Sequence, residues 1–294
     1  MRTPTRTAVA ATLAAASVVI AAPLATAGFD GHHRSGNVSS KVAGLTADGK
    51  LAIFKARSAE SATIVGTISG LAAGDALVGI DYRVQDGKLY GVGRAGGIYV
   101  IDTKTAQATK VGQLSVALTG TNFGVDFNPA ANALRVVSDS GQNLRISFAS
   151  GTPAVTTAVD APLSYPATPT APAVTPSGVS AAAYTNNDLD VDTATTLFDI
   201  DTVLDQVVIQ APANAGLLSA TGKLGVDAAA GAGFDIASKI GDDGATRSNT
   251  GLATLSVGGA YRLYSVDLLT GAVRSVGSFP AGVQVVDLAV PTKN

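Results

Sequence analysis

Aspartates are the residues of this chain best suited to chemistry, and four of them recur in similar surroundings. Each stands in an apolar stretch, in the segments VGIDYR, FGVDFN, AGFDIA and VVDLAV. The four are Asp81, Asp126, Asp235 and Asp287. Four carboxylates at one level of a symmetric fold predict a ring that binds a cation such as Ca²⁺. In the alternative, each carboxylate accepts hydrogen bonds from backbone N–H groups of a neighbouring repeat, and the repetition favours this structural role.

A second group of acids lies in the segment NNDLDVDTATT. Asp188, Asp190 and Asp192 alternate along it, and Asp199 follows eleven residues after Asp188. Oxygen ligands at alternate positions are typical of a calcium loop. However, Thr193 stands where such a loop has glycine. The alternative is a polar turn whose aspartates accept hydrogen bonds from the local backbone, and we favour that alternative.

The sequence contains few residues that could support other kinds of catalysis. The chain has no cysteine, and its two histidines, His32 and His33, are close to the N-terminus. A Ser-His-Asp arrangement, a thiol nucleophile and a zinc–thiolate site are therefore not expected. The glycines of Gly91–Gly96 match GxGxxG, but they separate two predicted strands and indicate a hairpin turn. We predict no catalytic and no cofactor-binding residues, and a function that is not enzymatic.

The elements that position the aspartates are repeated strands. Residues 79–93 (GIDYRVQDGKLYGVG) align without a gap with residues 124–138 (GVDFNPAANALRVVS). Residues 98–112 (IYVIDTKTAQATKVG) return as residues 263–277 (LYSVDLLTGAVRSVG). One unit therefore reads as four short strands joined by turns. A period of roughly 45–50 residues with four strands a unit predicts an all-β fold, a β-propeller, with the repeated aromatic residues packed between blades.

The repeats also predict how the ring closes. Complete units begin near Val78, Phe123, Val179 and Ala232. Residues 41–66 contain only the last three strands of a unit, and residues 284–290 supply only a first strand. Together they complete one blade, which gives five blades and leaves no open sheet edge. Residues 211–231 leave a degenerate sixth blade open as an alternative.

Two loops interrupt the repeats. Six prolines lie between Pro153 and Pro176, a density that is incompatible with a helix or an inner strand. This segment predicts a surface connector or, alternatively, a segment that binds a partner. Residues 241–251 (GDDGATRSNTG) predict a polar excursion between two strands.

The N-terminus indicates export. Residues 1–27 combine Arg2 and Arg6, an apolar run and an Ala-Thr-Ala site, as in a secretory signal peptide. We read residues 28–40 as a flexible leader and 41–294 as one propeller domain. The full chain has 20 basic and 22 acidic residues. Cleavage would remove two arginines and leave 18 basic residues, so the net charge would be about −4. We expect a monomer, free outside the cell or associated with its envelope. It would not bind nucleic acid or span a membrane after cleavage, and its partner would be a protein or a small ligand.

The LYGVG and IYVIDT strands, the Gly-hydrophobic-Asp strand and the TNND turn together resemble a secreted bacterial family, catalogued as domain of unknown function 4394. The resemblance covers about residues 41–290. It implies a propeller-like repeat fold and export, and it brings no catalytic residues with it. Binding or scaffolding is thus the expected function, with a Ca²⁺-dependent hydrolase or lyase that uses the aspartate ring as the alternative.

Overall fold

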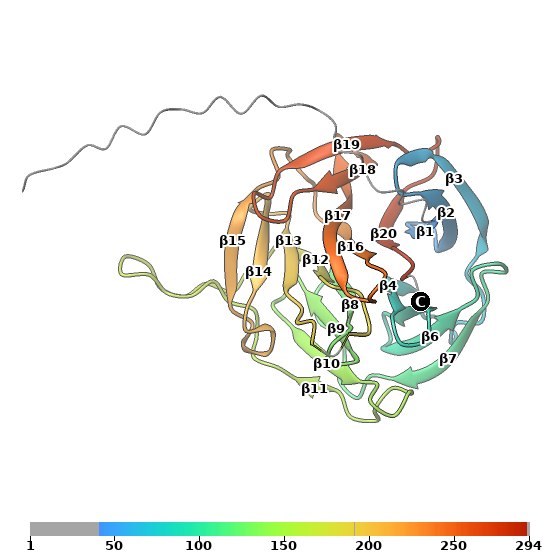
Figure 1. The fold of residues 1–294 in the computed structure, drawn as a ribbon, viewed down its shortest axis with the longest axis horizontal. Coiled ribbons are helices and arrows are strands. Elements are labelled where there is room, and N and C mark those ends of the chain that lie inside the picture. Colours follow the sequence, from blue (N-terminus) through green and yellow to red (C-terminus); the bar gives the residue numbers. More distant parts are fainter. Residues whose placement is uncertain (1–40, 191, 293–294) are drawn as a thin grey trace, which may run out of the picture. The chain divides into compact units, whose positions relative to one another are not determined.

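The described part of the chain is all-β. A computed structural model describes residues 41–190 and 192–292, which hold twenty strands and one short 3₁₀ turn. The strands form five four-stranded antiparallel sheets, arranged as blades around a central axis (Figure 1). The predicted five-bladed propeller is confirmed, and the six-bladed alternative is wrong. The predicted signal peptide, the leader, His32 and His33 lie outside the described residues.

Every blade begins with an inner strand at the axis and ends with an outer strand at the rim. Blade one consists of β20 (Val285–Ala289), β1 (Lys41–Thr46), β2 (Lys50–Lys55) and β3 (Ser58–Thr67). Blade two consists of β4 (Leu77–Arg83), β5 (Lys88–Gly93), β6 (Gly97–Ile101) and β7 (Ala108–Gln113). Blade three consists of β8 (Phe123–Asn128), β9 (Ala133–Ser138), β10 (Asn143–Ser147) and β11 (Ala158–Val159). Blade four consists of β12 (Val179–Tyr184), β13 (Leu197–Asp201), β14 (Gln206–Gln210) and β15 (Leu218–Lys223). Blade five consists of β16 (Ala232–Ile240), β17 (Thr246–Val257), β18 (Ala260–Val266) and β19 (Val273–Ser278).

The last strand closes the ring by pairing with the first. β20 lies antiparallel to β1, with Ala289 opposite Ala43 and Leu288 opposite Gly44. A side chain at residue 44 would not fit, because a Cβ there would lie 2.8 Å from Val285 Cγ1. This pairing confirms the predicted closure, and it gives the inner edge of β1 a partner.

Burial falls from the axis to the rim of each blade. All six residues of β12 are buried, whereas most residues of β7 and β15 are exposed or half-buried. An inner strand contacts the neighbouring blades on both faces, so it reads as a continuous apolar run. An outer strand has water on one side, which explains the threonines, lysines and serines of β7, β15 and β19.

The structure assigns secondary structure to the three segments that do not follow the repeat. Residues 211–231 contain the 3₁₀ turn η1 (Ala213–Ala215) and β15, the outer strand of blade four. The proline-rich segment supplies β11 and then a small hairpin with bridges between Tyr165 and Val174 and between Thr168 and Ala171. It is a connector between blades three and four, as predicted. The excursion at 241–251 is shorter than predicted, because β17 already begins at Thr246 and continues the hairpin with β16.

Apolar and aromatic side chains fill the seams between blades. Tyr90 of blade two contacts Phe127 and Phe148 of blade three edge-to-face, with ring centroids 5.2 and 5.4 Å apart. Phe127 and Phe148 also meet edge-to-face at 5.0 Å. These are favourable aromatic geometries, and they confirm that the repeated aromatic residues pack between blades.

Removal of β20 tests the closure. A chain that lacks residues 285–294 exposes the edge of β1 and loses the buried side chains of Val285 and Leu288. We expect its melting temperature to fall by more than about 10 °C, together with self-association through the free edge. Circular dichroism and light scattering measure both effects. A chain that lacks only residues 291–294 keeps β20 and should melt like the full chain; equal loss in both chains would contradict the role of the strand.

Candidate functional site

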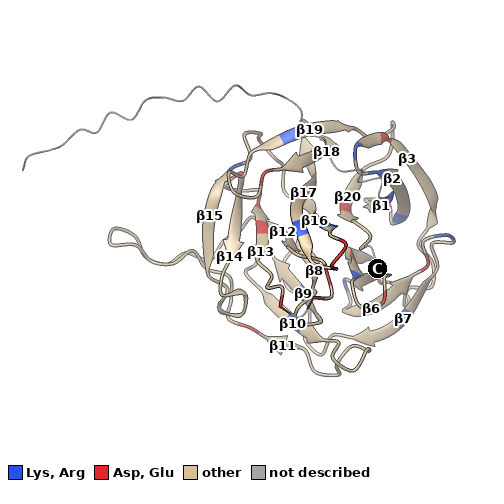
Figure 2. Ribbon diagram, in the orientation of Figure 1, with Lys and Arg blue, Asp and Glu red and all other residues tan. Residues whose placement is uncertain are grey.

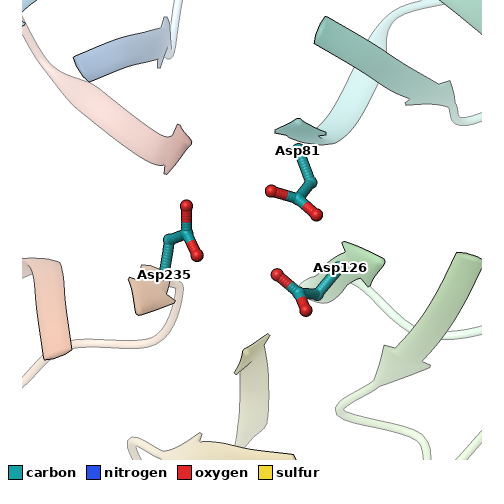
Figure 3. A group of neighbouring side chains, drawn as sticks. All are labelled: Asp81, Asp126 and Asp235. Carbon is teal, nitrogen blue, oxygen red and sulfur yellow. The ribbon is translucent and has the colours of Figure 1, made fainter. Parts of the chain in front are cut away.

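Three of the four repeated aspartates converge at the axis. One carboxylate oxygen each of Asp81, Asp126 and Asp235 lies within 4.8 Å of the other two (Figure 3). They come from β4, β8 and β16, the inner strands of blades two, three and five. We call these three residues the acid trio. Each follows a glycine by two residues, and the glycines let the inner strands approach: a Cβ at Gly124 would lie 2.5 Å from the Ala182 nitrogen.

The acid trio also ties neighbouring blades together. The Phe127 N–H donates to Asp81 Oδ2 at 2.7 Å, and the Tyr184 N–H donates to Asp126 Oδ2 at 2.8 Å. The Val290 N–H donates in the same way to Asp235 Oδ2. In every case the donor belongs to the inner strand, or its immediate continuation, of another blade. The predicted structural role is therefore present, and the same carboxylates also face one another.

The fourth aspartate occupies a different place, which corrects the prediction of a four-membered ring at one level. At the seams between blades two and three and between blades three and four, the residue that donates the N–H directly follows the aspartate position of its own strand. Val290 is the donor at the seam between blades five and one, and it directly follows Ala289. Ala289 is therefore the residue of β20 that is equivalent to the aspartates. Asp287 thus lies two residues earlier, where blades two, three and five have glycine and blade four has Ala181. Its Oδ2 accepts a hydrogen bond from the Ile80 N–H at 2.8 Å. The sequence alignment by the aspartate misses this shift, because the register of β20 is set by its pairing with β1.

Burial raises the pKa of all four carboxyl groups. Loss of solvation is the largest cause in each case, and it raises the pKa of Asp235 to about 7. The charge of Asp235 further raises the pKa of Asp81, and the charge of Asp81 that of Asp126. The backbone N–H donors act in the opposite direction. Burial thus disfavours the ionised form of the trio, and a bound cation would favour it.

The geometry of the acid trio fits part of a calcium coordination shell. Ca²⁺ binds six to eight oxygens at about 2.3–2.6 Å, so its ligands lie no more than about 5 Å apart. The separation within 4.8 Å meets this condition. Three carboxylates supply at most six oxygens, several of which already accept a backbone N–H. Shared protons and a bound cation are the two occupants that this arrangement can accommodate.

A hollow lies on the axis beside the acid trio, where the inner strands begin. Its volume is about 290 Å³, and residues of all five blades line it. The lining residues are Ala47, Leu77, Val78, Thr121, Asn122, Phe123, Ser180, Gly231, Ala232, Tyr261, Val286 and Asp287. We call this cavity the axial hollow. Asp287 is the one charged residue of this lining. Leu77 and Val78 precede Asp81 by three to four residues, so the trio lies further along the strands.

One residue of the axial hollow has an unused polar atom. Ser180 is 1% exposed, and its Oγ has no hydrogen-bond partner among the described residues. The repeat pattern does not distinguish Ser180, although it is the one polar residue before the tyrosine of VSAAAY. Asn122 and Tyr261 were missed as well; they stand outside the repeated aspartate motif, and only the ring brings them to the axis.

The aspartates of the predicted calcium loop form a hydrogen-bonded turn. Asp188 Oδ2 accepts from the backbone N–H and the hydroxyl of Thr246, at 2.9 and 2.6 Å, so it anchors the loop to β17. Asp188 Oδ1 accepts from the Asp190 N–H, and Asp190 Oδ1 from the Asp192 N–H. These bonds are those of the local turn. A calcium ion on the three residues stays a prediction.

Blade four carries its buried acid one strand further out. Ala183 takes the aspartate position of β12, while Asp199 of β13 is fully buried opposite Ala182. Neither oxygen of Asp199 has a hydrogen-bond partner in the described part of the chain. Burial raises its pKa well above the ordinary value, although the charge of Arg135 opposes this. Asp199 is therefore a separate buried acid of blade four, close to Arg135 of blade three, and not a member of the trio.

The chain matches a family model but no curated protein. The family is described as a domain of unknown function, DUF4394, and its model matches residues 50–289. No curated protein matches the chain. The described residues contain no helix with the length and hydrophobicity needed to cross a membrane.

Several solved structures are similar to parts of this chain at low identity. A structural genomics protein of unknown function from Bacteroides thetaiotaomicron is 15% identical, with a TM-score of 0.46, over 86% of this chain and 65% of that one. Sqt1 from Saccharomyces cerevisiae is 12% identical, with a TM-score of 0.40, over 85% and 64%. A chain of a mitotic checkpoint complex is 13% identical, with a TM-score of 0.39, over 94% and 92%. The chain spans just under two thirds of the length of the first two.

The raised pKa values predict a pH-dependent stability. Between the ordinary pKa of 3.8 and the value of about 7 for Asp235, the folded protein binds more protons than the unfolded chain. The free energy of unfolding must then fall as the pH rises through this window. We expect it to be lower at about pH 8 than at about pH 5 by roughly 1–3 kcal/mol.

Asp235→Asn tests this in urea titrations at both pH values. The amide keeps one acceptor oxygen for an N–H but does not titrate, so the variant should be less stable at acidic pH and depend less on pH. The matched control is Asp242→Asn, an exposed acid in the turn between β16 and β17. A pH dependence that Asp235→Asn leaves unchanged would show that the trio does not carry it.

Proposed function

We propose that this chain, which belongs to the DUF4394 family of domains of unknown function, is an exported binding module that takes a small ligand in the axial hollow. The observation that carries the proposal is the lining of that hollow by all five blades. A concave site with an apolar wall and a few polar groups is the usual form of a small-molecule site. Because the closed ring holds the lining residues in place, little conformational entropy would be lost when a ligand binds.

Binding without catalysis is the function that the chemistry of the site supports. Each oxygen of Asp81 and of Asp235 accepts a hydrogen bond from a backbone N–H. A general base must reach the proton of a substrate, whereas these bonds hold both carboxyl groups toward the backbone. Export is part of the proposal, on the basis of the signal-like residues 1–27. We further propose that the protein acts as a monomer outside the cell or at its envelope, with a small ligand as its partner and not nucleic acid.

A blocked hollow tests the proposed function. Val78 lines the hollow and is half-buried, so Val78→Phe fills part of the cavity without a change in charge. We expect the wild-type protein to retain compounds from extracellular and cell-envelope extracts in equilibrium dialysis, detected by mass spectrometry, and the variant to lose them. Val155→Phe, at an exposed loop position, is the control that should behave like the wild type. Retention of the same compounds by Val78→Phe, or of none by the wild type, would reject the axial hollow as a ligand site.

A Ca²⁺-dependent hydrolase or lyase is the second candidate. The convergence of the acid trio favours it, because a bound Ca²⁺ would hold the three carboxylates ionised and could polarise a substrate. In that case residues of the trio would be the metal ligands, and the axial hollow would receive the substrate.

Calcium-dependent melting decides whether this candidate has a basis. If the trio binds Ca²⁺, millimolar calcium should raise the melting temperature by roughly 2–6 °C, and a chelator should reverse the rise. If the acid trio is the site, Asp126→Asn should abolish the rise and Asp190→Asn should leave it unchanged. If the loop of Asp188, Asp190 and Asp192 is the site, the two variants should behave the other way round. The absence of any shift in the wild type would remove the metal basis of the second candidate.

A further inference from the structure

We infer that the axial hollow recognises a small organic cation, a primary ammonium group on a short aliphatic body. This inference rests on the proposed function, because it names the ligand class of the same hollow. It depends on three features of the lining: one acid without an ion-pair partner among the described residues, one buried hydroxyl without a partner, and several apolar side chains.

The hollow has one acidic side chain, that of Asp287. Burial raises the pKa of this carboxyl, so a bound cation would be needed to favour its ionised form. The carboxyl oxygens accept from the N–H groups of Ile80 and Leu288 at 2.8 and 2.9 Å. These two donors hold the carboxylate in place. None of the five ion pairs formed among residues 41–190 and 192–292 includes Asp287 or the acid trio. The acidic and basic residues of the blades are scattered over the fold (Figure 2). A cation in the hollow would therefore be the charge partner that Asp287 lacks.

The unpartnered hydroxyl of Ser180 can accept a hydrogen bond from a ligand donor. A buried polar atom without a partner is costly, and a ligand donor removes that cost. A primary ammonium group has three donors and no acceptor. Asn122 offers a further acceptor: its Nδ2 donates to Asp139, which fixes the amide, and its Oδ1 lies 3.0 Å from the place of a Cβ on Gly231. Asp287, Ser180 and Asn122 together match the three donors.

The remaining wall favours an organic cation over a hydrated metal ion. Leu77, Val78, Phe123 and Val286 are apolar and line the same hollow. The Arg94 guanidinium lies 5.0 Å from the centre of the Phe123 ring and supports it without lining the hollow. A hydrated metal ion would leave these side chains against bound water, whereas an aliphatic body buries them. A volume of about 290 Å³ admits a ligand of roughly a dozen non-hydrogen atoms.

The test compares n-butylammonium with 1-butanol, which has nearly the same shape and no charge. Ligand-observed NMR titrations on the wild-type protein measure both dissociation constants. We expect n-butylammonium to bind more tightly than 1-butanol by about ten-fold or more. Asp287→Asn should weaken n-butylammonium by about ten-fold and Ser180→Ala by about three-fold, while 1-butanol is nearly unaffected by Asp287→Asn. Asp242→Asn removes a charge at an exposed turn and should change neither constant.

Several outcomes overturn the inference. Equal binding of the two probes, no binding of either, or unchanged n-butylammonium binding in Asp287→Asn would each reject the cation class. Should Asp287→Asn fail to fold, Val78→Phe keeps all four acids and must abolish n-butylammonium binding; persistent binding would reject the location. Calcium chloride is titrated in parallel, and binding of Ca²⁺ without n-butylammonium also rejects the organic cation. If Val78→Phe loses extract compounds while no amine binds, the proposed function stands and the ligand class is wrong.

Discussion

The pairing of β20 with β1 is the constraint on which the rest of the structure depends. Five sheets enclose an axis only if the first three-stranded sheet gains its inner strand from the other end of the chain. The same pairing sets the register of β20, and therefore the level at which Asp287 meets Ile80. A shift of one residue would turn the buried Val285 and Leu288 toward the wrong neighbours. The same strand pairing therefore closes the ring and sets the geometry of the axial hollow.

Buried carboxyl groups at the axis combine two requirements that usually conflict. Their hydrogen bonds to the N–H groups of adjacent blades connect the inner strands of neighbouring sheets. Their mutual proximity and loss of solvation make the ionised state unfavourable, which raises their pKa values. Bound protons or a bound cation would neutralise the carboxylates while their hydrogen bonds to the neighbouring blades remain. The axis is thus held together by groups whose charge depends on what occupies it.

Blade four breaks the symmetry of this arrangement. Its inner strand has Ala183 at the aspartate position, and the seam to blade five is joined by amides instead. The Asn187 side chain donates to the Ile236 carbonyl at 2.9 Å, and Asn249 donates to Asn186 at 2.7 Å. The same strand also carries Ser180, whose free hydroxyl lines the axial hollow. A binding site on a symmetric fold needs such a departure, because a ligand without five-fold symmetry must find unequal walls.

The sequence alone predicted the repeated four-stranded units and the closing segment, and it favoured five blades over six, a count that the structure settled. These follow from local patterns: alternation, turn residues and a repeat that each blade must satisfy separately. It also identified Asp81, Asp126 and Asp235 as equivalent positions. Only the tertiary structure decided that Asp287 stands two residues out of that equivalence, and that Ser180, Asn122 and Tyr261 share one hollow with it. The physical reason is that inter-blade register and axial proximity come from contacts between distant segments, and no local pattern encodes those contacts.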